Sequence, residues 1–137
     1  MNITRKSILS MGSGIVLACG LIVILVLISA PFSSRFSLPV QKSVPYFIFV
    51  LSLLVIAPVI ARRLNRLADI KRVLGWTFIG IGMEFIAFPV SFLFVVKSAN
   101  STGALMASAM IFIYSVLFGM PAGLICIAIG IFLIKSG

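Results

Sequence analysis

The sequence predicts an all-α integral membrane protein, a four-helix transmembrane bundle with short loops that forms a single domain over residues 1–137. Of its residues, 62% are hydrophobic and 9% are charged, whereas soluble domains are about 45–50% apolar and about 25% charged. The apolar residues form four long segments separated by short polar ones, and about 20 mainly apolar residues are enough for one transmembrane helix. No polar stretch is long enough to build a soluble core.

The four predicted spans cover residues 8–30, 44–61, 74–96 and 104–134. The first is long for a signal peptide, so we expect it to be retained as a membrane span. Residues 31–43 contain two prolines and four serines. We expect these residues to form a loop, because prolines and clustered serines interrupt helices.

Prolines inside three of the spans predict local kinks or breaks in the helices. Pro58 should kink the last turn of the second span. Pro89 should clash with the carbonyl group of Phe85 and kink the third span, which also frees that carbonyl for another partner. The fourth span would be about 46 Å long as one helix, more than the roughly 30 Å of a bilayer core. Because Gly119 and Pro121 lie near its centre, we expect a helix break there.

Glu84, one of only two acidic residues, lies near the middle of the third span. A charge at the bilayer centre costs about 2.5–3.5 kcal/mol on insertion scales, so such a residue is a functional hypothesis by default. Gly80, Ala87 and Ser91 share a helical face with Glu84. We expect this face of small residues to turn towards the other helices.

The role of Glu84 has several alternatives, because no basic residue of the chain lies at its depth. Glu84 could be a neutral carboxyl group that is hydrogen-bonded to Ser52 or to a backbone carbonyl freed by a proline, or it could be a structural polar contact between helices. Alternatively, it pairs with a charge on another subunit or belongs to a path for protons or cations. The candidate polar residues of this layer are Glu84, Ser52, Tyr114 and Ser91. We expect a structural or subunit contact, with ion or proton coupling as the alternative.

Residues 62–73 are the most basic part of the chain. Their basic residues are Arg62, Arg63, Arg66, Lys71 and Arg72. Their apolar residues recur at intervals of three: Leu64, Leu67, Ile70 and Val73. This pattern predicts a short amphipathic helix on the membrane surface, with Asp69 paired to a nearby cation. We expect the basic side chains to bind anionic lipid headgroups; the alternative is that they only set the orientation of the chain.

The distribution of basic residues predicts that both termini are cytoplasmic. With four spans the termini share a side, and that side carries 8 of the 11 basic residues. Short cytoplasmic loops are enriched in lysine and arginine, which fixes the orientation. We expect a multi-pass protein of the prokaryotic inner (plasma) membrane.

Composition also excludes several functions. Histidine is absent and the two cysteines lie inside apolar spans, so we expect neither a metal site nor a cofactor. The sequence offers no pair of nucleophile and base, so we expect no enzyme. The net charge of +9 is explained by lipid headgroups and topology rather than by nucleic acid.

We therefore expect an accessory or structural subunit of a larger membrane complex. The alternative is a homo-oligomeric ion channel or proton-coupled small transporter that uses Glu84.

Overall fold

The computed structural model describes residues 2–33, 35–97 and 101–137, and these residues form four long helical rods. The first rod is α1 (Asn2–Ser33) and the third is α4 (Ile70–Lys97). The second consists of α2 (Leu38–Leu51), the π-helical turn η1 (Ser52–Ile56) and α3 (Ala57–Asn65). The fourth consists of α5 (Thr102–Tyr114), the π-helical turn η2 (Ser115–Gly119) and α6 (Met120–Lys135).

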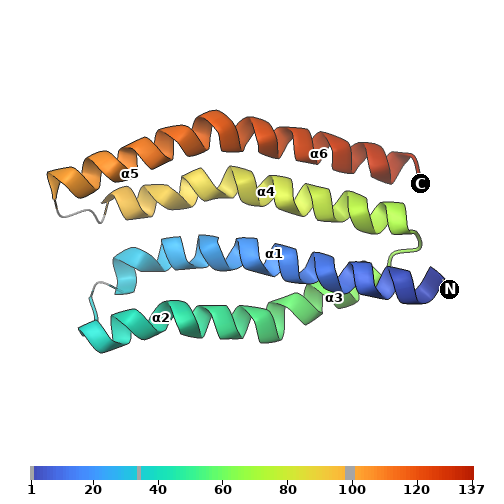
Figure 1. The fold of residues 1–137 in the computed structure, drawn as a ribbon, viewed down its shortest axis with the longest axis horizontal. Helices are drawn as coiled ribbons and strands as arrows, with labels where there is room; N and C mark the ends of the chain where they lie inside the picture. The colour runs from blue at the N-terminus through green and yellow to red at the C-terminus, as the bar shows by residue number, and fades with distance from the viewer. Residues whose placement is uncertain (1, 34, 98–100) are drawn as a thin grey trace.

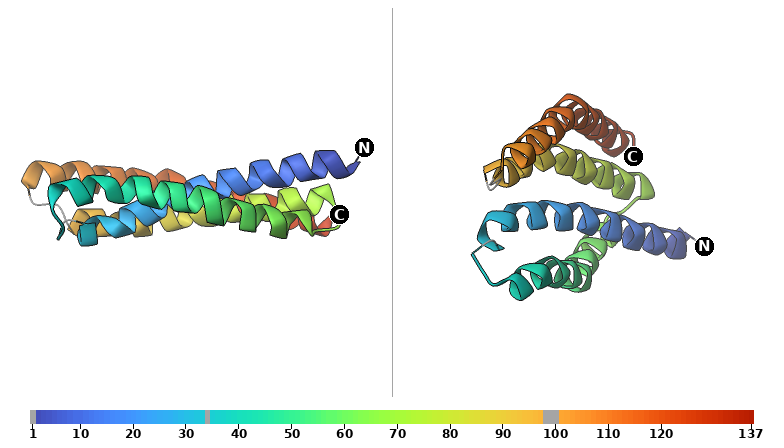
Figure 2. Two further views of the ribbon diagram at one scale, coloured as in Figure 1. Left: turned by 90° about the horizontal axis from the view of Figure 1, so that it is seen from below. Right: turned by 60° about the vertical axis from the view of Figure 1, so that its left-hand side comes forward.

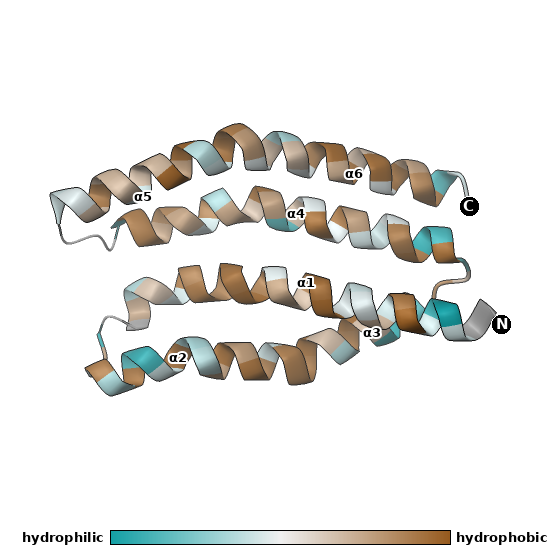
Figure 3. Cartoon of the chain, viewed as in Figure 1, coloured by the Kyte–Doolittle hydropathy of each residue, from teal (hydrophilic) through white to brown (hydrophobic). Residues whose placement is uncertain are grey.

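The four rods confirm the prediction of an all-helical chain with four helices that are long and apolar enough to cross a membrane. The described residues contain no strand. Hydrophilic residues lie mainly at the ends of the rods, and the central parts are mainly apolar (Figure 3). Both termini lie at the same end of the molecule (Figure 1).

The rods pack side by side as an open row rather than around a common interior. Their order across the row is α2–α3, α1, α4 and α5–α6 (Figure 1). Among the described residues, α2 and α3 do not contact α5 or α6, and α1 does not contact α6. Figure 2 shows the row from two further directions. Polar side chains that lie at the same depth on different rods therefore need not be near each other.

The loop predicted for residues 31–43 is much shorter than expected. The first helix continues to Ser33 and includes Pro31, and the second helix already begins at Leu38. Pro39 lies in the first turn of α2, where its missing N–H group has no partner to lose. Pro39 is thus compatible with helix because it lies in the first turn, whereas Pro31 lies in the last turn of α1, where the helix ends two residues later.

The separate surface helix predicted for residues 62–73 is wrong. Residues 62–65 complete α3, residues 66–69 form a tight turn, and α4 begins at Ile70. The apolar residues of this segment mostly turn inward: Leu64, Val73 and Leu17 of α1 form a buried cluster, with Leu67 packed against it. Burial against α1 therefore takes most of the apolar face that the sequence suggested would rest on lipid.

Each π-helical turn begins at a serine and ends two residues before a proline. The turn η1 starts at Ser52 and precedes Pro58, and η2 starts at Ser115 and precedes Pro121. The backbone N–H of Ala57 donates to the carbonyl of Ser52, five residues earlier. A wider turn accommodates the proline ring, which clashes with the carbonyl group four residues before it. The break predicted at residues 119–121 is therefore realised as a π turn.

Glycines bring α4 and α6 into backbone contact. A Cβ atom built on Gly82 would lie 2.5 Å from the carbonyl oxygen of Gly123, and one on Gly123 would lie 2.7 Å from that of Gly82. Gly75 and Gly130 repeat this reciprocal contact, at 2.8 and 2.6 Å. The two pairs are seven residues apart on each helix, so they recur on the same face after two turns. Small residues at such contacts allow close helix packing in membranes.

Candidate functional site

Glu84 projects from α4 towards α1 and lies against Gly20. A Cβ atom on Gly20 would overlap the carboxylate of Glu84, and its distance to Oε1 would be 2.9 Å. One turn earlier on α4, Gly80 receives the side chain of Leu17. The predicted face of Gly80 and Glu84 therefore does turn towards a neighbouring helix, and glycine on each helix makes room for a side chain of the other.

The carboxylate opens into a groove of about 290 Å³ between these two helices. Its walls are Gly20, Val23 and Ile24 of α1 together with Ile81, Glu84, Phe85 and Phe88 of α4. Glu84 is the only lining residue with a polar side chain. The groove is lined by α1 and α4 alone, so it is a recess on one face of the row rather than a closed chamber.

The carboxylate of Glu84 has no hydrogen-bonding or ionic partner among the described residues. All basic residues of the chain lie in turns or within two turns of a helix end. Those at the end that carries the termini are Arg5, Lys6, Arg62, Arg63, Arg66, Lys71, Arg72 and Lys135. Charge compensation for Glu84 in the middle of α4 must therefore come from a proton or from outside the chain.

The other predicted residues of this layer do not join Glu84 in the groove. Ser52 is 2% exposed and belongs to η1, which packs on α1. Ser91 is buried and its hydroxyl donates to the carbonyl of Ala87 at 2.8 Å. Tyr114 is 59% exposed, and its ring stacks on that of Phe118 with centroids 6.4 Å apart. The expected shared polar layer is therefore not formed, because an open row has no common interior.

The carbonyl group of Phe85, which Pro89 deprives of its usual helical partner, is covered by the fourth rod. A Cβ atom on Gly119 would lie 3.4 Å from this oxygen. Pro89 itself is buried, and α4 continues as helix to Lys97. Gly119 of η2 therefore lies beside the part of α4 that precedes Pro89 by one turn.

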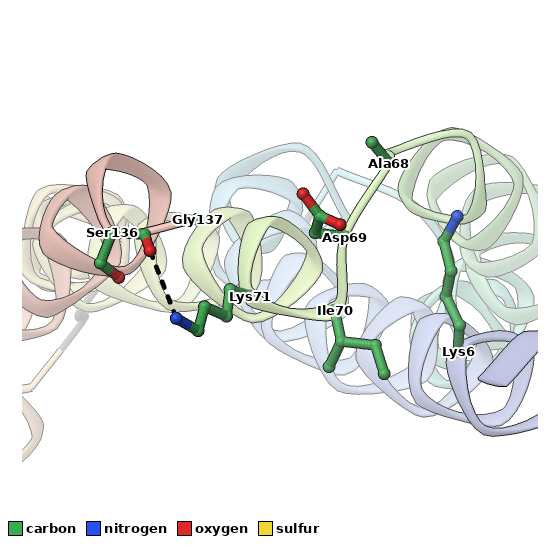
Figure 4. Close-up of a pocket in the computed structure, with 7 residues that line it drawn as sticks. All are labelled: Lys6, Ala68, Asp69, Ile70, Lys71, Ser136 and Gly137. Carbon is green, nitrogen blue, oxygen red and sulfur yellow. Dashed lines mark hydrogen bonds between the residues drawn. The ribbon is translucent and has the colours of Figure 1, made fainter.

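A second recess, of about 520 Å³, lies at the end that carries both termini. Figure 4 shows its lining residues, Lys6, Ala68, Asp69, Ile70, Lys71, Ser136 and Gly137. The Lys71 ammonium group donates to the backbone carbonyl of Ser136 at 3.2 Å, which ties the start of α4 to the end of α6. The expected ion pair of Asp69 with a neighbouring cation is not among the interactions of the described residues.

The predicted headgroup-binding residues remain together although their segment is not a surface helix. Arg62 and Arg63 end α3, Arg66 lies in the turn, and Lys71 and Arg72 begin α4. All five side chains are exposed. They therefore form a cationic cluster at one end of the row.

The described part of the chain does not bring potential metal ligands together. No group of three potential metal ligands occurs there. Cys19 and Cys126 are free thiols on separate rods. Comparisons with protein-family models, with curated proteins and with solved structures find no match to this chain.

Of the residues that line the groove, sequence reasoning identified only Glu84; Gly20, Phe85 and Phe88 are among those that it missed. Nothing in the spacing of Gly20 singles it out, because the first span also contains Gly12, Gly14 and Ala18. Phe88 could have been found, since it lies one turn after Glu84 and therefore beside it on the helix. Phe85 could not have been found in this way, because it directly follows Glu84 in sequence and adjacent residues do not face each other on a helix.

Proposed function

We propose that this chain is an accessory or structural subunit of a larger membrane protein assembly. The observation that supports it is the open row: within the described residues, the first rod contacts the second and third, the fourth rod contacts only the third, and the rods do not close around a common interior. The outer faces of such a row can contact other membrane proteins. Glu84 lies on one of these faces and has no hydrogen-bonding or ionic partner among the described residues.

Purification in a mild detergent tests the subunit proposal. The tagged chain, expressed at its natural level, should elute with other membrane proteins in fixed stoichiometry, as measured by native mass spectrometry. Glu84→Leu should lower the yield of those partners if the groove takes part in assembly. Met83→Leu is a matched control, because Met83 is 62% exposed and does not line the groove. A homogeneous particle that contains this chain alone would contradict the proposal.

A homo-oligomeric channel or proton-coupled transporter is the second candidate, favoured specifically by the unpartnered carboxylate in the groove. Because the described rods of one copy do not close around a common interior, such a transporter needs at least two copies whose faces complete a path. Reconstituted protein should then show an ion or proton flux that Glu84→Gln abolishes while the oligomer stays intact in cross-linking. Absence of flux, together with fixed co-purifying proteins, would favour the subunit.

In both cases we propose that the cationic end faces the cytoplasm of a prokaryotic cell and contacts anionic lipid. The supporting observation is that 8 of 11 basic residues share the end of the row that carries both termini. Positively charged loops are retained on the cytoplasmic side, and that leaflet attracts basic side chains.

A further inference from the structure

We infer that the groove between α1 and α4 is a binding site for a lipophilic monovalent cation, with Glu84 as its counter-ion. This inference goes beyond the subunit proposal, since it requires binding to a single chain and neither assembly nor transport. Three features support it: the charge of the one polar group, the character of the walls and the size of the recess.

The charge of the site selects a cation. Glu84 is the only polar side chain in the lining, and none of the chain's basic residues lies at its depth. When Glu84 is ionised, an anion would be repelled by its carboxylate, and a neutral ligand would leave the negative charge unpaired. Buried charges are favourable only when they are paired. A bound cation supplies the missing charge.

The walls select an apolar cation rather than a metal ion. Besides Glu84, the lining offers aliphatic side chains and two phenylalanine rings, Phe85 and Phe88. Hard metal ions need several oxygen ligands, and no cluster of three potential ligands exists in the described residues. An organic cation with hydrocarbon substituents instead gains from burial against Val23 and Ile81 and from cation–π attraction to the rings.

The dimensions of the groove favour a compact molecule over a partner helix. Its lining extends over residues 20–24 of α1 and residues 81–88 of α4, which corresponds to about 6 Å and about 11 Å along the helix axes. A transmembrane partner helix makes contacts that repeat over several turns. The volume of about 290 Å³ lies near the lower end of small-molecule sites, about 300–1,000 Å³.

Gly20 keeps the carboxylate accessible. A side chain at this position would overlap the carboxylate of Glu84, and so would force it out of its place in the groove. The carboxylate can therefore lie against the backbone of α1 while its other side faces the recess. This geometry leaves one side of the counter-ion for a ligand that enters from the open face.

Binding of tetraphenylphosphonium to the purified full-length chain in nanodiscs tests the inference. Isothermal titration calorimetry should give saturable binding with one site per chain. Tetraphenylborate, which has nearly the same shape but the opposite charge, should not saturate this site. Glu84→Gln should weaken tetraphenylphosphonium binding at least tenfold, Glu84→Asp should retain part of it, and Phe88→Ala should weaken it severalfold. Met83→Ala, next to Glu84 in sequence but outside the lining, should bind like the unmodified chain.

A second variant covers the possibility that Glu84→Gln disturbs folding. Val23→Trp fills the recess from α1 without removing the charge, and should abolish binding while circular dichroism and elution volume stay unchanged. Equal binding by the unmodified chain, Glu84→Gln and Val23→Trp would overturn the inference. So would a leucine-rich transmembrane peptide with a central lysine that binds through Glu84 when tetraphenylphosphonium does not, because the groove would then be a helix-docking site.

Discussion

The carboxylate of Glu84 in α4 lies directly against the backbone of Gly20 in α1, so closely that a methyl group on Gly20 would overlap it. The position of the one acidic group within the spans is thus set by a residue of another helix. Two kinds of close glycine contact occur in this fold. At Gly20 the neighbour is the end of a flexible side chain, whereas between α4 and α6 the neighbours are backbone carbonyl groups.

We predict that Gly20→Ala changes the groove more than it changes stability. The Glu84 side chain can rotate away from the new methyl group, so the loss in free energy of unfolding should lie at the low end of the range of about 1–3 kcal/mol that overpacking costs. Its carboxylate would leave the recess, and tetraphenylphosphonium binding should weaken at least fivefold. Gly12→Ala is the matched control on the same helix, because a Cβ atom there meets nothing within 4 Å. Equal binding by both variants would show that Gly20 does not position the carboxylate.

We predict that Gly82→Ala and Gly130→Ala each destabilise the fold. A Cβ atom at Gly82 or Gly130 would lie 2.5 or 2.6 Å from a backbone oxygen of the opposite helix. Since neither backbone can move without separating α4 from α6, each change should lower the free energy of unfolding by about 1–3 kcal/mol. Equilibrium unfolding in mixed micelles with increasing dodecyl sulfate measures this change.

The control for these variants is Gly103→Ala in α5, where a Cβ atom would meet nothing within 4 Å. It should be neutral or slightly stabilising, because alanine favours helix over glycine by up to about 1 kcal/mol. If all three variants unfold alike, the glycine contacts do not determine the spacing of α4 and α6.

The four long helices were predictable from sequence because the length and hydropathy of an apolar segment are enough to identify a membrane-spanning helix. The break at Pro121 was predictable as well, since proline acts on its own helix and this one follows the π turn η2. Pro89, by contrast, lies inside the uninterrupted helix α4. The contacts between helices were less predictable. The pairing of Gly123 with Gly82 and of Gly130 with Gly75 depends on which rods become neighbours.

The surface-helix prediction failed for a related reason. Leu64 and Val73 have the spacing of an amphipathic surface helix, yet they are buried against Leu17 in the structure. Periodicity shows that residues share a face, but it does not say whether lipid or another helix covers that face. Ser52 and Tyr114 were grouped with Glu84 for a similar reason. The sequence indicates the depth of each residue in its span, but it does not say which spans lie next to each other.

We predict that single cysteines at Ser37 and Asn65 are labelled from opposite sides of the membrane. Each lies in or beside a turn, at opposite ends of the second rod, and a cysteine at Ser136 should behave like the one at Asn65. The background chain would carry Cys19→Ala and Cys126→Ala, so that only the introduced thiol reacts. Labelling in intact cells with a membrane-impermeant maleimide should modify position 37 alone. Modification of positions 37 and 65 from one side would exclude four spans.

The last prediction concerns the cationic cluster of Arg62, Arg63, Arg66, Lys71 and Arg72. Because Leu64 and Leu67 pack inward rather than into lipid, binding of anionic headgroups at this end should be mainly electrostatic. Juxtamembrane basic residues gain about 1 kcal/mol each near an anionic leaflet. Replacing Arg62, Arg63 and Arg66 with glutamine should therefore weaken retention of cardiolipin or phosphatidylglycerol by up to about 100-fold. Raising the salt concentration should weaken it in the unmodified chain as well.

Native mass spectrometry of the chain with bound lipid measures this retention. The matched control replaces Arg35, Lys42 and Lys97 with glutamine, which removes the same number of charges from the other end of the row. Arg5 and Lys6 remain in both variants and should keep the orientation of the chain, as checked by labelling at position 37. Lipid retention should fall only in the first variant. If it stays unchanged there while the orientation is correct, the cluster sets topology during insertion and binds no lipid afterwards.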